Sequence, residues 1–140
     1  MAFAVVHMQK IKAGAIRGIQ SHVNREHPPK TNPDIDESRS SENYTLLHSD
    51  NFTRAIKGIV SEYAPETKTV RKDAVLLCNF IVTSDEQTMK SMTAYQQRKF
   101  FEESKEWFCR RYGEENVVFS EVHMDETTPH MHLGIVPIKV

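Results

Sequence analysis

The chain has 140 residues and a formal net charge of −1, with 39% hydrophobic and 26% charged residues. This length suits one domain with a single buried core, and the composition excludes an intrinsically disordered chain. No apolar run approaches the roughly 20 residues of a membrane span, and the first residues lack the features of a secretory signal. We therefore expect a cytoplasmic protein with no membrane anchor in this segment, in which Cys78 and Cys109 are buried free thiols.

The apolar pattern predicts an α+β fold: one mainly antiparallel five-stranded sheet with helices packed on it. In chain order it predicts a strand at 3–11, a helix at 14–25, a polar loop at 27–42, a short strand at 43–47, a helix at 51–63, a loop at 64–72, a central strand at 74–83, a helical segment at 86–112, and strands at 116–123 and 130–138. Ser84 and Gln87 have capping-box spacing, Thr93 is a point where the helix can restart, and Gly113 suits its end. The polar turn at 124–129 makes the last two strands an antiparallel hairpin.

Positive charge is concentrated at the start of the chain. Residues 1–30 contain five cations and one carboxylate, namely Lys10, Lys12, Arg17, Arg25 and Lys30 against Glu26. Such a segment can hold the phosphates of a nucleic acid. A solvated helix face is the alternative that the charges alone leave open.

The strongest chemical signal is the segment 123–132, which reads His-Met-Asp-Glu-Thr-Thr-Pro-His-Met-His. Side chains alternate along a strand, so His130 and His132 point to the same face. The predicted hairpin brings His123 back beside them. Three neutral imidazoles can hold one divalent metal and leave coordination positions open. Asp125 or Glu126 can add a ligand or orient a histidine.

This segment resembles the metal motif of the HUH endonucleases, and its longer form resembles the Mob/Pre (MobV-type) plasmid mobilisation and recombination relaxases. Weaker similarities extend along the chain: Met-Gln-Lys-Ile-Lys-Ala-Gly from residue 8, His-Val-Asn-Arg-Glu from 22, Ser-Arg-Ser-Ser-Glu-Asn-Tyr from 38, Arg-Lys-Asp-Ala-Val from 71, Ile-Val-Thr-Ser-Asp from 81 and Tyr-Gly-Glu-Glu-Asn from 112. The resemblance covers nearly all of the chain. It implies that residues 1–140 are the N-terminal catalytic core of a longer protein that forms a dimer at full length.

The resemblance implies an enzyme that nicks one DNA strand at a plasmid origin of transfer and keeps the 5′ phosphate as a covalent adduct. Its partner is single-stranded or supercoiled plasmid DNA. Its cofactor is a divalent metal bound by His123, His130 and His132; Mn²⁺ is expected, and Mg²⁺ or another ion is an alternative. The family is understood to use a histidine nucleophile, which matches His22, and Glu126 is the second catalytic residue that we assign.

His22 also suits this role on chemical grounds, because a neutral imidazole attacks without a strong base. Arg25, one helical turn later, could hold a phosphate beside it. Tyr44 is an alternative nucleophile and a candidate for stacking on an unpaired base. Tyr112 and Arg71 are further candidates for contact with DNA.

Other functions fit parts of this pattern. A rolling-circle replication initiator has the same metal motif but usually carries a catalytic tyrosine after it. A non-catalytic DNA-binding or repressor module would be favoured by loss of a ligand or of the nucleophile, and neither is lost. Three histidines could also serve a small-molecule metallohydrolase, against which the basic N-terminal segment and Tyr44 argue.

Overall fold

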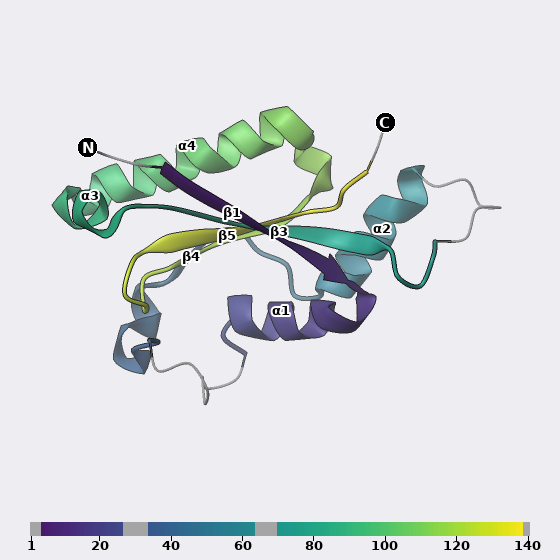
Figure 1. The fold of residues 1–140 in the computed structure, drawn as a ribbon, viewed down its shortest axis with the longest axis horizontal. Coiled ribbons are helices and arrows are strands. Elements are labelled where there is room, and N and C mark those ends of the chain that lie inside the picture. The colour runs from purple at the N-terminus through teal and green to yellow at the C-terminus, as the bar shows by residue number, and fades with distance from the viewer. Residues whose placement is uncertain (1–3, 27–33, 64–69, 139–140) are drawn as a thin grey trace.

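A computed structural model describes residues 4–26, 34–63 and 70–138 of the chain (Figure 1). Its strands are β1 (Ala4–Lys12), β2 (Tyr44–Leu47), β3 (Val75–Ser84), β4 (Val117–His123) and β5 (His130–Ile135). Its α-helices are α1 (Ile16–Val23), α2 (Phe52–Tyr63), α3 (Glu86–Ser91) and α4 (Ala94–Tyr112). Short 3₁₀ helices precede α1 at Ala13–Ala15, β2 at Glu37–Glu42 and β4 at Glu114–Asn116.

The five strands form one sheet in the order β1-β3-β5-β4-β2, and every neighbouring pair is antiparallel. The predicted α+β fold with an antiparallel five-stranded sheet is therefore confirmed. The predicted hairpin is confirmed as well, because β4 and β5 pair from Val117↔Ile135 to His123↔His130. β5 lies at the centre of the sheet, so His130 and His132 lie on a strand between β3 and β4.

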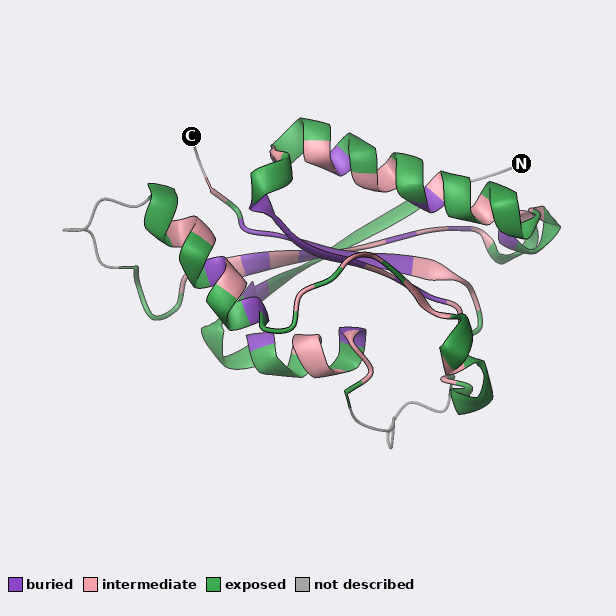
Figure 2. Ribbon diagram, turned by 180° about the vertical axis from the view of Figure 1, so that it is seen from behind, coloured by how far each residue is buried: buried purple, intermediate pink, exposed green. Residues whose placement is uncertain are grey.

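Helices cover both faces of the sheet (Figure 1). α1 and α2 bury Ile16, Val23, Phe52 and Ile56 in a core on one face, which we call the α1 face. α3 and α4 bury Met89, Phe101 and Phe108 on the other, the α4 face. Figure 2 shows the resulting pattern, in which buried residues follow the sheet and the inner sides of the helices. The site described below lies on the α1 face.

A close contact on the α1 face fixes how β4 and β5 pack under α2. The Phe119 ring stacks on the Phe52 ring with centroids 4.3 Å apart and an interplanar angle of 4°. The same Phe119 ring covers Gly134 of β5, where an added Cβ would lie 2.2 Å from its Cε1 atom. Only a residue without a side chain fits at position 134, because a stacked ring in a packed core cannot move aside.

Several local expectations are corrected by the structure. The cap of α3 is Asp85, whose side chain accepts from the Thr88 amide, and the predicted Ser84/Gln87 capping box is wrong. The helix does restart after Thr93, which forms the capping box with Gln96. Gly113 ends α4 with φ +95°, as its position predicted. The polar segment 27–42 includes the 3₁₀ turn at Glu37–Glu42; residues 27–33, and 64–69 of the second predicted loop, lie outside the described part.

The two cysteines are free but only half-buried, so their predicted full burial is wrong. Partial burial nevertheless raises the pKa of the Cys78 thiol and of the Cys109 thiol. Among the described residues, no helix is both long and apolar enough to cross a membrane.

Candidate active site on the α1 face of the sheet

The β4–β5 hairpin brings three histidines together. His130 and His132 lie on the α1 face, while Met131 between them is fully buried in the core of the α4 face. His123 at the end of β4 is paired directly with His130. The ring centroids of His123 lie 5.4 Å from His130 and 4.8 Å from His132, and those of His130 and His132 lie 5.0 Å apart. The hairpin thus places the predicted ligand residues as the sequence suggested.

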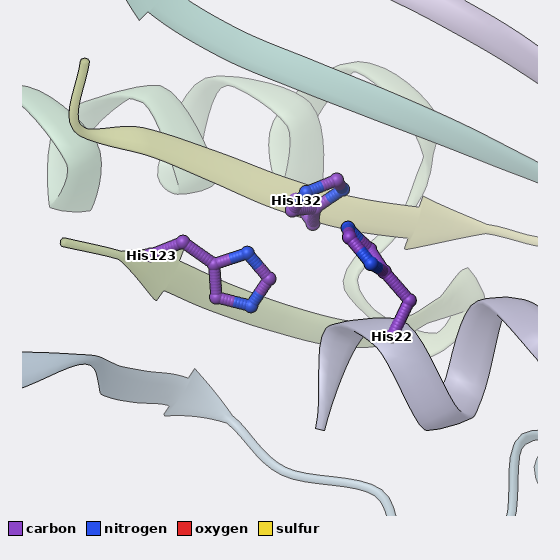
Figure 3. Close-up of side chains that lie close together, drawn as sticks. All are labelled: His22, His123 and His132. Atoms are coloured by element: carbon purple, nitrogen blue, oxygen red, sulfur yellow. The ribbon is translucent and has the colours of Figure 1, made fainter. Parts of the chain in front are cut away.

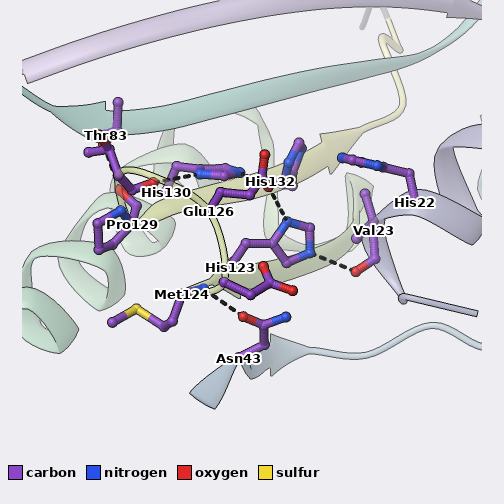
Figure 4. Close-up of polar contacts among 12 residues, drawn as sticks. His22, Val23, Asn43, Thr83, His123, Met124, Glu126, Pro129, His130 and His132 are labelled. Carbon is purple, nitrogen blue, oxygen red and sulfur yellow. Dashed lines mark hydrogen bonds and ion pairs between the residues drawn. The ribbon is translucent and has the colours of Figure 1, made fainter. Parts of the chain in front are cut away.

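Each of these imidazoles has one ring nitrogen within hydrogen-bond distance of a carbonyl oxygen. Figure 4 shows the contact of His123 with Val23. The partner of His123 Nε2 is the Val23 carbonyl oxygen at 2.8 Å. His130 Nδ1 lies 2.9 Å from the Thr128 carbonyl oxygen, and His132 Nδ1 makes a longer contact of 3.4 Å with Asn79 Oδ1. A carbonyl oxygen only accepts, so these nitrogens carry the ring protons. A lone pair is left on His123 Nδ1 and on His132 Nε2, and also on His130 Nε2 whenever that imidazole is neutral.

The buried lone pairs fit a metal site. His123 Nδ1 and His132 Nε2 are buried and have no hydrogen-bond partner, which is costly for a polar atom inside a protein. Burial, and then the neighbouring histidines His123, His130 and His22, hold the pKa of His132 well below its ordinary value, so its imidazole is neutral. Neutral imidazole is the form that binds Zn, Mn or a similar divalent ion. A metal would satisfy these otherwise unpaired nitrogens.

Glu126 lies between the histidines, in the turn after β4. Its Oε2 atom is 3.1 Å from His130 Nε2, 3.6 Å from His123 Nδ1 and 3.0 Å from Arg25 Nη2. Burial opposes its ionisation, but the contacts with His123, His130 and Arg25 outweigh it and hold the pKa of Glu126 below its ordinary range. The pKa of His130 is raised, because Glu126 and the Thr128 carbonyl outweigh the effect of its burial. His123, Glu126 and His130 thus form a second group whose ligand atoms lie within 4.8 Å of one another.

His22 approaches the same place from α1 (Figure 3). Its ring centroid lies 5.8 Å from that of His123 and 5.6 Å from that of His132, with both pairs edge to face. One nitrogen each of His22, His123 and His132 lie within 4.8 Å of one another. Partial burial, followed by the charges of Arg25 and His123, lowers the pKa of His22. His22 is therefore neutral at pH 7 and faces the three predicted ligands.

Two contacts tie α1 to the hairpin. One is the hydrogen bond that His123 donates to the carbonyl of Val23, the residue after His22. The other is Arg25, whose Nε and Nη2 atoms donate to Asp125 at 3.0 and 2.8 Å. Arg25 Nη1 also donates to the His22 carbonyl at 2.8 Å. Arg25 has a φ of +50°, a left-handed conformation that costs energy in a residue with a Cβ. These long-range contacts compensate that cost.

The predicted contact of Arg25 with DNA stays a prediction, and in this structure the Arg25 side chain is engaged by protein groups. Its side chain is only 14% exposed, and its guanidinium already holds Asp125, Glu126 and the His22 carbonyl. The expectation that it holds a DNA phosphate is not supported by this geometry, because few of its donors are left. Asp125 is fully buried, faces Arg25 and accepts from Ser40, so the carboxylate beside the histidines is that of Glu126.

The remaining predicted DNA contacts are not part of this cluster. Tyr44 packs against the core of the α4 face, with the Arg98 guanidinium 4.7 Å from its ring centroid. Tyr112 lies at the end of α4 near Phe108 and Phe80, also on that face. Arg71 lies before β3, and its Nε is 3.7 Å from Asp73 Oδ1. The structure brings none of these three side chains to the histidines.

Some residues of the site were not predicted from the sequence. Asn79 is fully buried on β3, where its Oδ1 faces His132 and its Nδ2 donates to Gln9. A lone amide within the apolar run at 76–82 was a signal that could have been read. Ser40 and the Val23 carbonyl gave no such signal, because only tertiary contacts make them part of the site.

A hairpin with three clustered histidines that faces a histidine-bearing helix is the arrangement that comparison with known proteins assigns to a family. A sequence model described as plasmid recombination enzyme (Mob_Pre) matches residues 1–140, and the chain belongs to this family. The predicted family membership is thereby confirmed.

Individual relatives agree with this assignment. A plasmid recombination enzyme of a Bacillus species is 47% identical over 141 residues, 99% of this chain and 34% of the relative. A type 2 enzyme of Staphylococcus aureus is 43% identical, with the same coverage of 99% and 34%. The chain thus spans about a third of the length of these curated relatives.

A solved structure is also similar. It is a MobM relaxase domain (MOBV; Mob_Pre) bound to plasmid oriT DNA, with Mn bound. It matches with a TM-score of 0.92 and 41% identity over 98% of this chain and 71% of that one.

Proposed function

We propose that this chain is the catalytic core of a DNA relaxase, which cuts one strand at a plasmid origin of transfer and retains the 5′ phosphate. The observation that carries the proposal is the cluster of His123, His130 and His132 opposite His22, whose ring centroids lie 5.4, 4.8 and 5.0 Å apart. Within it, His123 Nδ1 and His132 Nε2 are buried without a hydrogen-bond partner. The similarity to a relaxase domain bound to oriT DNA supports the same substrate class here.

His123, His130 and His132 would hold a divalent metal, for which we propose Mn²⁺ because the similar relaxase structures contain it. When bound, the ion supplies positive charge at the scissile phosphate, where negative charge develops during attack. Glu126 is the carboxylate positioned to complete this site. The carbonyls of Val23 and Thr128 hold the His123 and His130 rings by their protonated nitrogens, so that their lone pairs remain directed at the site.

His22 would supply the nucleophile. One neutral ring nitrogen attacks phosphorus with its lone pair, a P–N bond forms, and the P–O3′ bond breaks on the opposite side. The 3′ oxygen takes up a proton, and the other ring nitrogen of His22 releases one, so charge is balanced. The product is a free 3′ hydroxyl and a 5′ phosphoramidate on His22. The lowered pKa of His22 keeps this nitrogen unprotonated for the attack.

Arg25 would act through His22 and Glu126 instead of through DNA. It joins the carbonyl of His22 to the carboxylates of Asp125 and Glu126, and so sets the distance between the attacking ring and the ligand hairpin. Orientation of this kind accounts for a large share of the rate in such reactions. The alternative nucleophile Tyr44 has its side chain packed on the other face of the sheet, which argues against it.

The test is covalent capture of DNA. The chain is incubated with a labelled single-stranded oligonucleotide and with supercoiled plasmid, both carrying the origin of a plasmid that encodes a relative. We expect a denaturation-resistant adduct and relaxed plasmid with Mn²⁺, and neither with EDTA. Absence of nicking and of adduct with every divalent metal tested, while DNA still binds, would favour a non-catalytic DNA-binding module instead.

A further inference from the structure

A hollow of about 540 Å³ lies between α1 and α2, and no histidine of the site lines it. Its walls are polar and basic: Arg17, Gln20, Asn51, Thr53, Arg54 and Lys57. The two helices lie side by side on the same face of the sheet, and α1 also carries His22 (Figures 1 and 3). The hollow therefore adjoins the helix of the proposed nucleophile.

Within the described residues, the three cations of the hollow have no ion-pair partner. Arg17, Arg54 and Lys57 are all exposed, and none of them takes part in an ion pair within the described part of the chain. Arg25, in contrast, forms ion pairs with two carboxylates. No described residue that lines the hollow is a carboxylate. The Glu26 carboxylate, which accepts from Gln20 at 2.7 Å, is outnumbered by the three cations, so the hollow has a net positive charge that can attract an anion.

The backbone around the hollow is fixed. Gln20 accepts from the amide of Phe52, the first residue of α2, at 2.8 Å and donates to the Asp50 carbonyl at 3.0 Å. Asn51 accepts from the Arg54 amide at 2.9 Å. The first turn of α2 has no acidic residue, so the positive end of its dipole adds to the two cations of that helix. The cations of both helices are thus held on a common frame.

We infer that this hollow binds the phosphate backbone of the DNA strand beyond the phosphate that faces His22. The inference rests on the function proposed above. Arg17 precedes His22 by five residues, about 7.5 Å along the helix axis and about 140° around it, so a strand that lies at His22 turns around α1 to reach the hollow. No aromatic side chain lines the hollow. It would consequently hold phosphates and leave the reading of bases to other parts of the protein.

The test is the salt dependence of DNA binding. The variant is Arg54→Ala with Lys57→Ala, and the matched control is Lys99→Ala with Arg111→Ala, two exposed cations of α4 across the sheet. The probes are a labelled oligothymidylate and a labelled hairpin duplex of mixed sequence. Loss of two phosphate contacts should reduce the slope of log K against log salt by about 1.4 for the single strand. The control should retain the wild-type slope.

The two probes identify the form of DNA that the hollow contacts, since a reduced slope with either one supports the inference. Equal slopes for variant, control and wild type with both probes would overturn it. An equal reduction of the slope in variant and control would also overturn it, because the loss of any two surface cations would then explain the effect. Adduct formation by the wild type is measured on the same preparation. If the wild type forms adduct but the slopes do not change, only the hollow is wrong; if it forms none, the proposed function fails.

Discussion

Arg25 and Asp125 form a two-point ion pair across 100 residues of sequence, with N–O distances of 3.0 and 2.8 Å. Arg25 follows α1, and Asp125 lies in the turn between β4 and β5. The hydrogen bonds from Arg25 and Ser40 outweigh burial and hold the pKa of Asp125 below its ordinary range, so the pair is charged near neutral pH. This pair links the helix of His22 to the turn that contains Glu126.

Asp125→Asn should therefore destabilise the metal-free protein by about 2 kcal/mol, since it weakens a buried charged contact while Glu126 still partners Arg25. Urea denaturation in EDTA measures this loss. Asp50→Asn is the control, because the Asp50 side chain is 93% exposed and should change stability by less than about 0.5 kcal/mol. Similar effects of the two substitutions would show that the Arg25–Asp125 link contributes little.

His132→Ala should lower the affinity for Mn²⁺ by one or two decades or more and abolish nicking, because it removes one of three converging lone pairs. Calorimetric titration of Mn²⁺ measures the affinity. His48→Ala is the matched control, since His48 is exposed and its partner is Asp50. The proposed metal site would be wrong if a His130→Ala, His132→Ala double variant bound Mn²⁺ as the wild type does.

His22→Ala should abolish the DNA adduct and leave metal binding largely intact, because the ligands that we propose lie on the hairpin. Tyr44→Phe should retain the adduct. A phosphoramidate on imidazole is acid-labile, since protonation makes the nitrogen a good leaving group, whereas a tyrosyl ester resists mild acid. The adduct on a labelled oligonucleotide is therefore expected to be lost at low pH and to survive alkali. An acid-stable adduct that disappears in Tyr44→Phe and persists in His22→Ala would reverse the assignment.

Gly134→Ala should destabilise the fold by about 1–3 kcal/mol, because the new Cβ would overlap the Phe119 ring that stacks on Phe52. Gly58→Ala in α2 is the control, since nothing lies within 4 Å of the Cβ it would add. That change should stabilise the protein by about 0.5–1 kcal/mol, as alanine does inside a helix. Chemical denaturation of both variants gives the comparison. A neutral Gly134→Ala would mean that the ring can move aside, contrary to its stacked position.

The sequence alone determined the strands, the hairpin and the convergence of His123, His130 and His132. Side-chain alternation along a strand and the closure of a short turn are local, so spacing in the sequence predicts them. The resemblance added His22, whose location on a short helix was also readable from its apolar period. The helix N-caps could be predicted only in part from the sequence. Several polar residues before α3 are possible N-caps, and in the structure it is Asp85 that caps the helix.

The tertiary structure alone decided which side chains share a face and which charges meet. Tyr44 is paired with Val122, one residue before His123, and that register directs its side chain to the α4 face. No pattern within β2 encodes its register against β4. In the same way, the sequence shows a cation near His22, but the ion pair of Arg25 with Asp125 depends on how α1 packs on the sheet. Arg17 and Arg54, two cations of the hollow, lie 37 residues apart in the sequence. Only the packing of α1 against α2 brings them together.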